Sequence, residues 1–361
     1  MTPQGIATVA RQEFRLRIRA GRWRWLLVAF FAVLLGFTVL LRLGLSNLPP
    51  QEVPFPGTVL YGGLMLFVLG LALLVVPALA AQSVNGDRER GTLAVLQVTR
   101  LTAGDIAVGK LAAAWGTSLV FLALTAPLVA YAMAQEGVPV GRVVVVTVVL
   151  ALLLGTVCAV SLLLSALLTR TSTSGVLAYL TVFALTVGTL VVFGLATAVT
   201  AERFTASPED YCPSDADIPP DVPQPERRHV VDDCLAQTET FVMTRTRTDR
   251  TWWLLAPNPF VVLADAAPQL PEPPPGIVVN GPSAADLDPL GQLGRQVRGL
   301  RDPPPPGRGP VYEDPLEEPE SQAVWPTGLA VNVALGVGAL VLTARRLRTP
   351  TRTLPRGQRV A

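Results

Sequence analysis

NGDRERGTLAVLQVTRLTAGDIAVGK, residues 85–110, lies between two long apolar segments of the chain. It is the only substantial charged stretch in the middle of a strongly apolar half. A charged connection between two such segments is typical of a loop at a membrane face. Because Leu93 and Leu96 recur within it at helical spacing, we expect this loop to carry a short helix.

The composition is that of a membrane protein. Half of the residues are apolar, 16% are charged, and the mean hydropathy is +0.45. A hydrocarbon core of roughly 30 Å requires about 20 helical residues to cross it. Segments that meet this standard are residues 26–45, 59–81, 111–134, 143–168, 175–199 and 324–344. The sequence therefore predicts an all-α integral membrane protein with six transmembrane helices.

The arginines predict its orientation. Residues 1–24 carry six arginines and one acid, and residues 345–361 carry six arginines and no acid. In contrast, residues 201–323 carry 21 acids and ten arginines. The excess of arginine on cytoplasmic segments places both termini and the 82–110 loop in the cytoplasm. An even number of spans is required for this topology, and six satisfies it.

This topology defines the parts of the chain. Residues 1–24 mix apolar residues with arginines and are expected to form a cytoplasmic interfacial amphipathic helix. A basic flank that only fixes the orientation is an equally good interpretation. Residues 25–200 hold spans one to five with the 82–110 loop, residues 324–344 form span six, and residues 345–361 form a basic cytoplasmic tail.

Residues 201–323 form a long, acidic, proline-rich extracytoplasmic loop. Residues 201–326 hold 23 of the 33 prolines, so we expect extended or disordered stretches, with some order near Cys212, Cys234 and Phe241. Within this loop, TWWLLAPNPFVVLAD (residues 251–265) is too short and too rich in proline to be a seventh span. It is expected to be an interfacial or re-entrant piece anchored by Trp252 and Trp253.

The three cysteines fall into two groups. Cys158 lies within span four, where a cysteine behaves as a small apolar residue. Cys212 and Cys234 both lie in the extracytoplasmic loop, and an oxidising compartment permits a disulfide between them. Their spacing alone leaves open whether they are bonded.

Residues 104–110, GDIAVGK, match the spacing of a phosphate loop. The next residue is Leu111 rather than the Ser or Thr that binds magnesium, and Thr102 with Asp105 has the spacing of a capping box. We therefore expect no nucleotide site and no catalytic site on this chain. The lone His229 is expected to be exposed, so the chain should bind no metal and no cofactor.

The charged loop resembles the cytoplasmic loop of type 2 ABC transporter permeases, the membrane subunits of the ABC-2 family. In that family an acidic residue precedes Gly-Thr-Leu, a short amphipathic helix follows, and a Gly-Lys pair opens the next span. The Asn-Pro-Phe at 258–260 is also similar to sequences of such proteins. The resemblance implies an ATPase-coupling role, by a helix at residues 88–98, for Arg88, Glu89, Arg90, Gly91, Thr92, Leu93, Leu96, Gly109 and Lys110. A solvated loop that only connects two spans is the simpler interpretation.

The resemblance also implies the partners. The chain would be the permease subunit of an ATP-driven transporter, most naturally an exporter, in a bacterial plasma (inner) membrane. An ABC ATPase subunit would carry ATP and Mg, a second permease subunit would complete a homo- or heterodimer, and lipid would surround the spans, with no role for nucleic acid. The alternative is a membrane-anchored interaction or assembly protein that captures an envelope partner through its extracytoplasmic loop.

Overall fold

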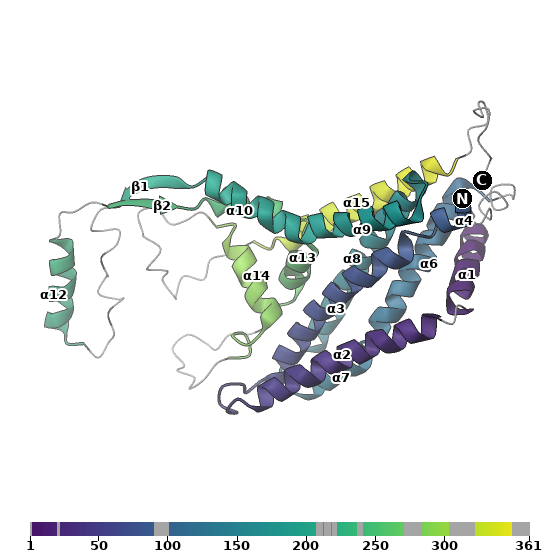
Figure 1. Ribbon diagram of the computed structural model, residues 1–361. Helices are drawn as coiled ribbons and strands as arrows, with labels where there is room; N and C mark the ends of the chain where they lie inside the picture. Colours follow the sequence, from purple (N-terminus) through teal and green to yellow (C-terminus); the bar gives the residue numbers. More distant parts are fainter. Residues whose placement is uncertain are drawn as a thin grey trace.

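A computed structural model describes residues 2–19, 22–89, 101–206, 222–236, 241–270, 283–302 and 322–348, together with Cys212 and Ile218. Six helical stretches among these residues are long and apolar enough to cross a membrane. They lie side by side in one elongated bundle (Figure 1). The prediction of a mostly helical protein with six candidate spans is therefore confirmed.

The spans differ in their continuity. Four spans are single helices: span one is α2 (Arg22–Ser46), span two is α3 (Pro56–Ala80), span four is α8 (Val140–Leu167) and span six is α15 (Trp325–Arg346). Span three consists of two helices, α6 (Ala103–Ala123) and α7 (Ala126–Ala134). Span five consists of α9 (Thr171–Phe183), the π-helix η1 (Ala184–Gly188) and α10 (Thr189–Val199). The sequence predicts neither the interruption of span three nor the π-helix in span five.

The interruption of span three has a local cause. Residues 124 and 125 turn between α6 and α7, and Pro127 lies in the first turn of α7. Proline is tolerated there because the first N–H groups of a helix have no intrahelical partner. In addition, α6 begins at Ala103, eight residues before the predicted start of the span at 111.

The core of the bundle lies around α3 and α8. Leu64 and Leu69 of α3 and Leu150 of α8 are buried. In contrast, α2 and α10 expose large apolar side chains such as Leu40 and Leu195. Long helices that expose leucine and valine suit a surrounding solvent of lipid.

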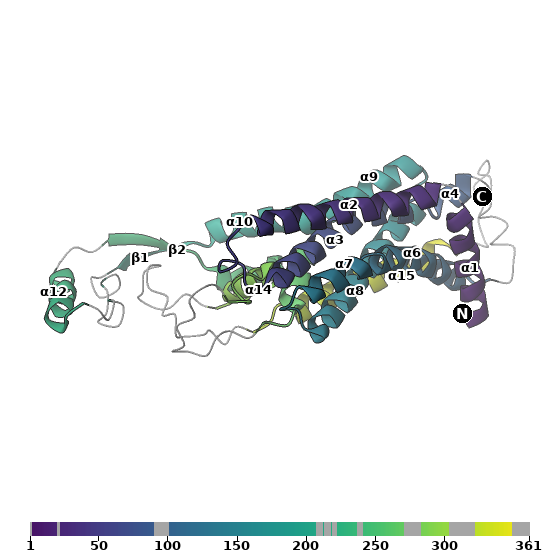
Figure 2. The ribbon, with the colours of Figure 1, turned by 90° about the horizontal axis from the view of Figure 1, so that it is seen from below.

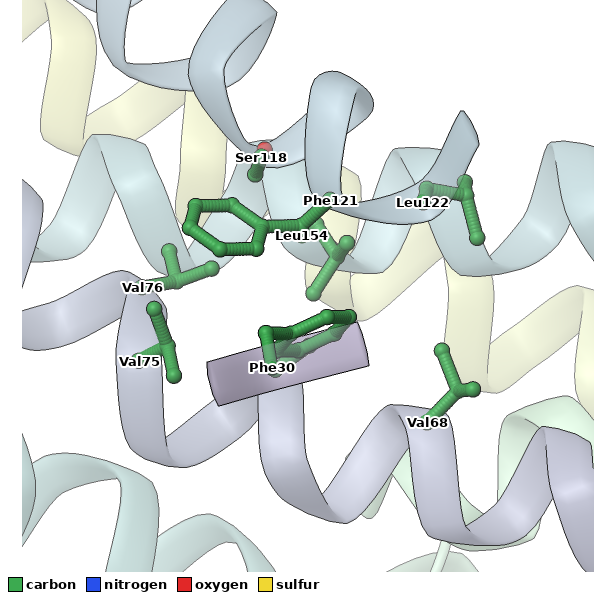
Figure 3. Close-up of a pocket in the computed structure, with 9 residues that line it drawn as sticks. Phe30, Val68, Val75, Val76, Ser118, Phe121, Leu122 and Leu154 are labelled. Carbon is green, nitrogen blue, oxygen red and sulfur yellow. The ribbon is translucent and has the colours of Figure 1, made fainter. Parts of the chain in front are cut away.

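A small cavity lies among α2, α3, α6 and α8. The rings of Phe30 and Phe121 meet edge to face beside it, with centroids 4.8 Å apart (Figure 3). The cavity has a volume of about 10 Å³, and its lining is apolar apart from Ser118. This is about the smallest volume that holds one water molecule. It is therefore a packing defect and too small for a substrate.

The first helix, α1 (Pro3–Arg19), lies across one end of the bundle in both views (Figures 1 and 2). It packs on α6, where Gly109 allows the close approach. A Cβ atom built on Gly109 would lie 2.6 Å from the Cβ of Val9, so a larger residue would force the two helices apart. Residues 1–24, where a cytoplasmic interfacial helix is expected, are helical over Pro3–Arg19, and the position of this helix at a membrane surface stays a prediction. We call the end that carries α1 the proximal end and the opposite end the distal end.

At the distal end, span five continues into a two-stranded antiparallel hairpin. Strand β1 (Glu202–Ala206) pairs with β2 (Phe241–Arg245), and α12 (Gln224–Leu235) lies beyond them, away from the bundle (Figure 1). A disulfide joins Cys212 to Cys234 of α12. We call the hairpin and α12 the distal arm.

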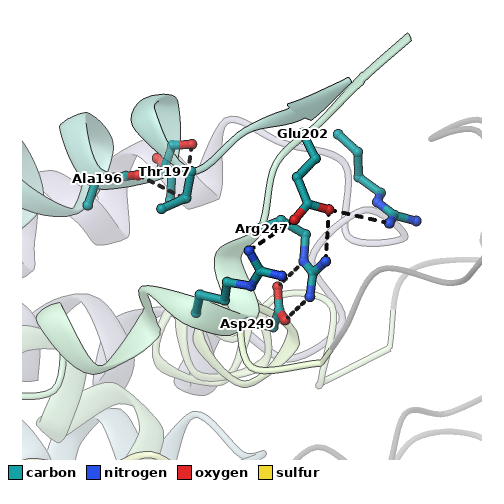
Figure 4. A network of polar contacts seen from close by, with 8 residues as sticks. Ala196, Thr197, Glu202, Arg247 and Asp249 are labelled. Atoms are coloured by element: carbon teal, nitrogen blue, oxygen red, sulfur yellow. Dashed lines mark hydrogen bonds and ion pairs between the residues drawn. The ribbon is translucent and has the colours of Figure 1, made fainter. Parts of the chain in front are cut away.

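Ion pairs hold the base of the hairpin together. Glu202 accepts hydrogen bonds or ion pairs from Arg247 and Arg250, each at 2.9 Å, and Arg247 also pairs with Asp249 (Figure 4). The hydrogen bond from Arg247, assisted by the nearby arginine charges, lowers the pKa of Glu202. Arg247 likewise lowers the pKa of Asp249. The base of the hairpin is therefore stabilised by ionised carboxylates.

Two further described parts of the distal loop, residues 248–270 and 283–302, form a cap on the bundle. Two 3-10 turns (η2, Thr248–Arg250, and η3, Trp252–Leu254) lead into α13 (Pro259–Ala266), and α14 (Pro289–Gly299) follows. Helix α14 is an element that the sequence analysis does not predict in this proline-rich region. It buries Leu290, Gly294 and Val297, and this helical spacing supplies the apolar face that the overall composition conceals.

A buried ion pair and buried hydrogen bonds fix the cap to the bundle. Arg142 of α8 binds the Asp288 carboxylate, and both side chains are 1% exposed. Arg142 also donates to the carbonyl oxygen of Pro268 at 2.7 Å. The Asp265 carboxylate accepts from the backbone N–H groups of Val324 and Trp325, each at 2.6 Å, at the start of α15. The predicted interfacial or re-entrant piece at 251–265 therefore packs against the bundle itself.

Candidate functional site

The charged loop singled out in the sequence begins at the proximal end. Its first residues form a short helix, α4 (Asn85–Glu89), directly after span two. The predicted coupling residues Arg90, Gly91, Thr92, Leu93 and Leu96 lie outside the described residues, as does most of the predicted helix at 88–98. The described flanks show how this loop is attached to the rest of the protein.

Lys110 is the centre of that attachment. Its side chain is fully buried, and its ammonium group binds the carboxylates of Glu13 in α1 and Asp87 in α4. It also donates to the carbonyl oxygen of Ser83 at 2.9 Å. Three acceptors match the three N–H donors of a lysine, so the buried charge is fully satisfied. One side chain of α6 thereby holds both the interfacial helix and the start of the loop.

Lys110 lies within its helix rather than at its start. The Gly109-Lys110 pair is expected to open span three, and Lys110 is the eighth residue of α6, the helix that begins after Thr102. It lies roughly 10 Å along the helix from its first residue, at about 1.5 Å per residue. Because the whole stretch 104–110 is helical, it does not have the loop conformation that a phosphate loop requires.

The end of the loop is fixed by a capping box, as predicted. The Thr102 side chain accepts from the backbone N–H of Asp105, and the Asp105 carboxylate accepts from the backbone N–H of Thr102 at 3.0 Å. The same carboxylate accepts from the N–H of Thr2 at 2.8 Å. The start of α1 and the start of α6 are therefore joined at one side chain.

The start of the loop also binds spans four and five. The Ser165 hydroxyl of α8 accepts from the N–H groups of Val84 and Asn85, each at 3.1 Å. Arg88 donates to the carbonyl oxygen of Leu168 at 3.2 Å, and the Glu89 carboxylate accepts from the N–H of Thr171 at 3.3 Å. Two of the predicted coupling residues thus contact the connection between spans four and five.

Some residues that hold the root of the loop cannot be recognised from the sequence alone. Glu13 comes from α1 and Ser165 from α8, and only the folded chain brings them to the loop. A second apolar cluster lies beside them and joins Val84 and Ile106 to Leu347 at the end of span six. Spans two, three, four, five and six therefore all meet at the root of the loop.

A model of the family described as ABC-2 family transporter protein matches residues 7–250. The chain belongs to the ABC-2 transporter family. A search of curated proteins found no match. The matched region of this ABC-2 chain runs from α1 to the base of the hairpin and so includes Glu13, Asp87, Lys110 and Ser165 at the proximal end. ABC-2 permeases are membrane transport subunits, and the ATPase of such a transporter is a separate subunit.

Proposed function

We propose that this ABC-2 permease is driven by a separate ABC ATPase that pushes on the 82–110 loop. The observation that carries the proposal is the buried Lys110, which ties the loop to α1 and α6. Because packed elements shift as units, a force on the loop would move several spans together. A loop that only connected two spans would not require a buried charge with two carboxylate partners.

The distribution of arginine supports the cytoplasmic side as the one on which the ATPase would act. The two arginine-rich termini and the loop would face the cytoplasm under the positive-inside rule. Arg88 and Glu89 at the edge of the loop, with Leu93 and Leu96 beyond them, provide charged and apolar residues for a groove on the partner. ATP and Mg would be bound by that partner.

Transport would require a second permease subunit, identical or related. Within the described part of this chain, the cavity inside the bundle is far too small for a cargo. We therefore place the path between two bundles, which closure of a pair of ATPase subunits would rock apart and together. Export of an apolar or amphipathic cargo fits spans whose buried charges, Lys110 and Arg142, are already paired.

Purification of the tagged chain in mild detergent tests this proposal. An ATPase with a complete phosphate loop is expected to co-purify, and the Glu89→Lys, Leu96→Asp double variant is expected to lose it. The Arg11→Gln variant, on the exposed face of α1, is a matched control that should retain it. A chain that never retains an ATPase, and whose export function survives removal of every candidate ATPase, would contradict the proposal.

The distal arm supports a second candidate function, capture of an envelope partner. The hairpin and α12 project beyond the bundle (Figure 1), and a disulfide joins Cys212 to Cys234 of α12. Deletion of residues 205–250 separates the two functions. Under the capture hypothesis the deletion abolishes function, whereas under the transport hypothesis stimulation of the ATPase remains.

A further inference from the structure

Span five is attached to the bundle by few contacts. The structure describes all of residues 171–199, and among them only Ser174 and Ala178 are buried. Both lie in α9, near the proximal end. The Ser174 hydroxyl donates to the carbonyl oxygen of Ala81 at 2.9 Å, and the Tyr179 hydroxyl donates to that of Leu74 at 2.9 Å. The first half of span five is therefore attached to span two, next to the charged loop.

The middle of span five departs from α-helical geometry. Residues Ala184–Gly188 form a π-helix between α9 and α10. Such segments are rare, interrupt the regular hydrogen bonding of a helix, and are frequent at functional sites. They are also places where long helices bend. Thr186 lies roughly 20 Å from the distal end of the span at about 1.5 Å per residue.

One side chain outside the span reaches this segment. The Asn258 amide nitrogen donates to the carbonyl oxygen of Thr186 at 2.8 Å and to the hydroxyl of Thr189 at 2.9 Å. Its amide oxygen accepts from the N–H of Phe260 at 2.9 Å and caps α13. Asn258 is 2% exposed, so these bonds are shielded from water. A single asparagine thus joins the π-helix of span five to the first turn of α13.

Asn258 is itself held from the other side. Asn332 of span six donates to the carbonyl oxygen of the preceding residue, Pro257, at 3.1 Å. The backbone of Asn332 in turn accepts from the Thr156 hydroxyl of α8 at 3.1 Å. Gly328 of span six lies so close that a Cβ atom there would be 2.2 Å from the carbonyl oxygen of Ala256. The segment before α13 is therefore fixed to spans four and six.

We propose that the π-helix is a pivot in span five, and that Asn258 is the positioning residue that holds this pivot against the α13–α14 cap. Motion of α9 with the charged loop is then absorbed at residues 184–188 while α10 stays with the cap. The use of this pivot during transport rests on the proposed function. The pivot itself does not depend on an ATPase or any other partner of this chain.

Spin-label distance measurements on the purified permease in lipid nanodiscs test the proposal. Labels at Leu195 and Leu40 report on α10 relative to α2, and labels at Val176 and Leu40 report on α9 relative to the same reference. All three side chains are exposed, and the free Cys158 is replaced by serine beforehand. Labelled protein is diluted with unlabelled protein so that only distances within one chain are measured.

The Asn258→Asp variant isolates the proposed contact. A carboxylate still accepts from Phe260 and caps α13, but it has no N–H to donate to Thr186 and Thr189. The Leu195–Leu40 distance distribution is expected to broaden by at least twofold, with the Val176–Leu40 distribution unchanged. A merely structural role for Asn258 would broaden both distributions.

Two further variants keep the test decisive. Thr189→Val removes one acceptor on span five and leaves α13 untouched, so it should broaden the Leu195–Leu40 distribution to a smaller extent. Thr181→Val is the matched control, because the Thr181 hydroxyl bonds only to its own helix at Leu177. Unchanged distributions in both Asn258→Asp and Thr189→Val would overturn the proposal. Since no ATPase is present, this result is independent of the proposed function.

Discussion

Lys110 of α6, which is fully buried, and Glu13 of α1 form an ion pair between residues 97 positions apart in the sequence. The same ammonium group binds Asp87 at the start of the charged loop. An interfacial helix, a loop and a span therefore share one charge. The stability of the proximal end and the coupling of the loop should both depend on it.

The Lys110→Met variant tests this junction. It would leave the carboxylates of Glu13 and Asp87 close together without the ammonium, and removal of one partner of a buried ion pair costs about 3–5 kcal/mol. We expect a lower thermal unfolding temperature in detergent and loss of ATPase stimulation. Addition of Glu13→Gln and Asp87→Asn should recover most of the stability but not the stimulation. An unfolding temperature equal to that of wild type would contradict the role of Lys110.

The Arg142→Met variant tests the attachment of the cap. Burial raises the pKa of Asp288, and Arg142 opposes that increase. Without Arg142 the pKa rises further, and a carboxylate whose folded pKa is raised destabilises the protein increasingly as the pH rises through that value. The variant should therefore be least stable near pH 8 and recover as the pH falls towards 5.

Asp288→Asn in the Arg142→Met background is the control for that effect. Asparagine removes the charge and can still cap α14, where the Asp288 carboxylate accepts from Gly291 at 2.7 Å. The double variant should be more stable than the single variant at pH 8, with a weaker dependence on pH. Thermal unfolding at several pH values measures both. Equal pH profiles for the two variants would show that Asp288 does not carry the effect.

The hairpin should loosen in acid. Because the folded pKa values of Glu202 and Asp249 are lowered, the stabilisation that they provide is complete above their ordinary values of 4.5 and 3.8. It is lost as the pH falls through the lowered values. Hydrogen exchange in β1 and β2 should therefore be slow at pH 6 and accelerate below pH 4, after correction for intrinsic rates. Glu202→Gln should show the faster exchange already at pH 6.

Loss of the capping box at the start of α6 should destabilise the protein less than loss of a buried ion pair. Replacement of Thr102 by alanine removes the acceptor for the N–H of Asp105, and loss of such a cap costs about 1 kcal/mol. Thr102→Ser retains the hydroxyl and should remain close to wild type. Chemical denaturation of the purified protein compares them, and equal midpoints for the alanine and serine variants would show that the cap contributes little.

The sequence predicts what depends on local signals. Six long apolar segments specify six spans, because length and hydropathy alone decide whether a helix can cross a bilayer. Thr102 and Asp105 predict their capping box, because both partners lie within one turn of a helix. The identification of the ABC-2 family from Gly91-Thr92-Leu93 and its surroundings is also confirmed.

The features that the sequence does not predict depend on contacts between residues far apart in the chain. No pattern near Lys110 indicates that its partner is Glu13, because the pair forms only when α1 folds back across α6. Helix α14 is missed because prolines on both sides conceal a short apolar face that includes Leu290 and Val297. The π-helix at 184–188 also has no local signature, since its residues are those of an ordinary membrane helix.

Photo-crosslinking from the charged loop in intact cells tests the coupling of this loop to an ATPase most directly. A photoreactive amino acid at Leu96 is predicted to crosslink to a protein with a complete ATP-binding phosphate loop, identified by mass spectrometry. The same amino acid at the exposed Leu195 of α10 should not capture it. Crosslinks from Leu96 only to extracytoplasmic proteins, or to no ATPase at all, would contradict the claim that this loop is the point of coupling.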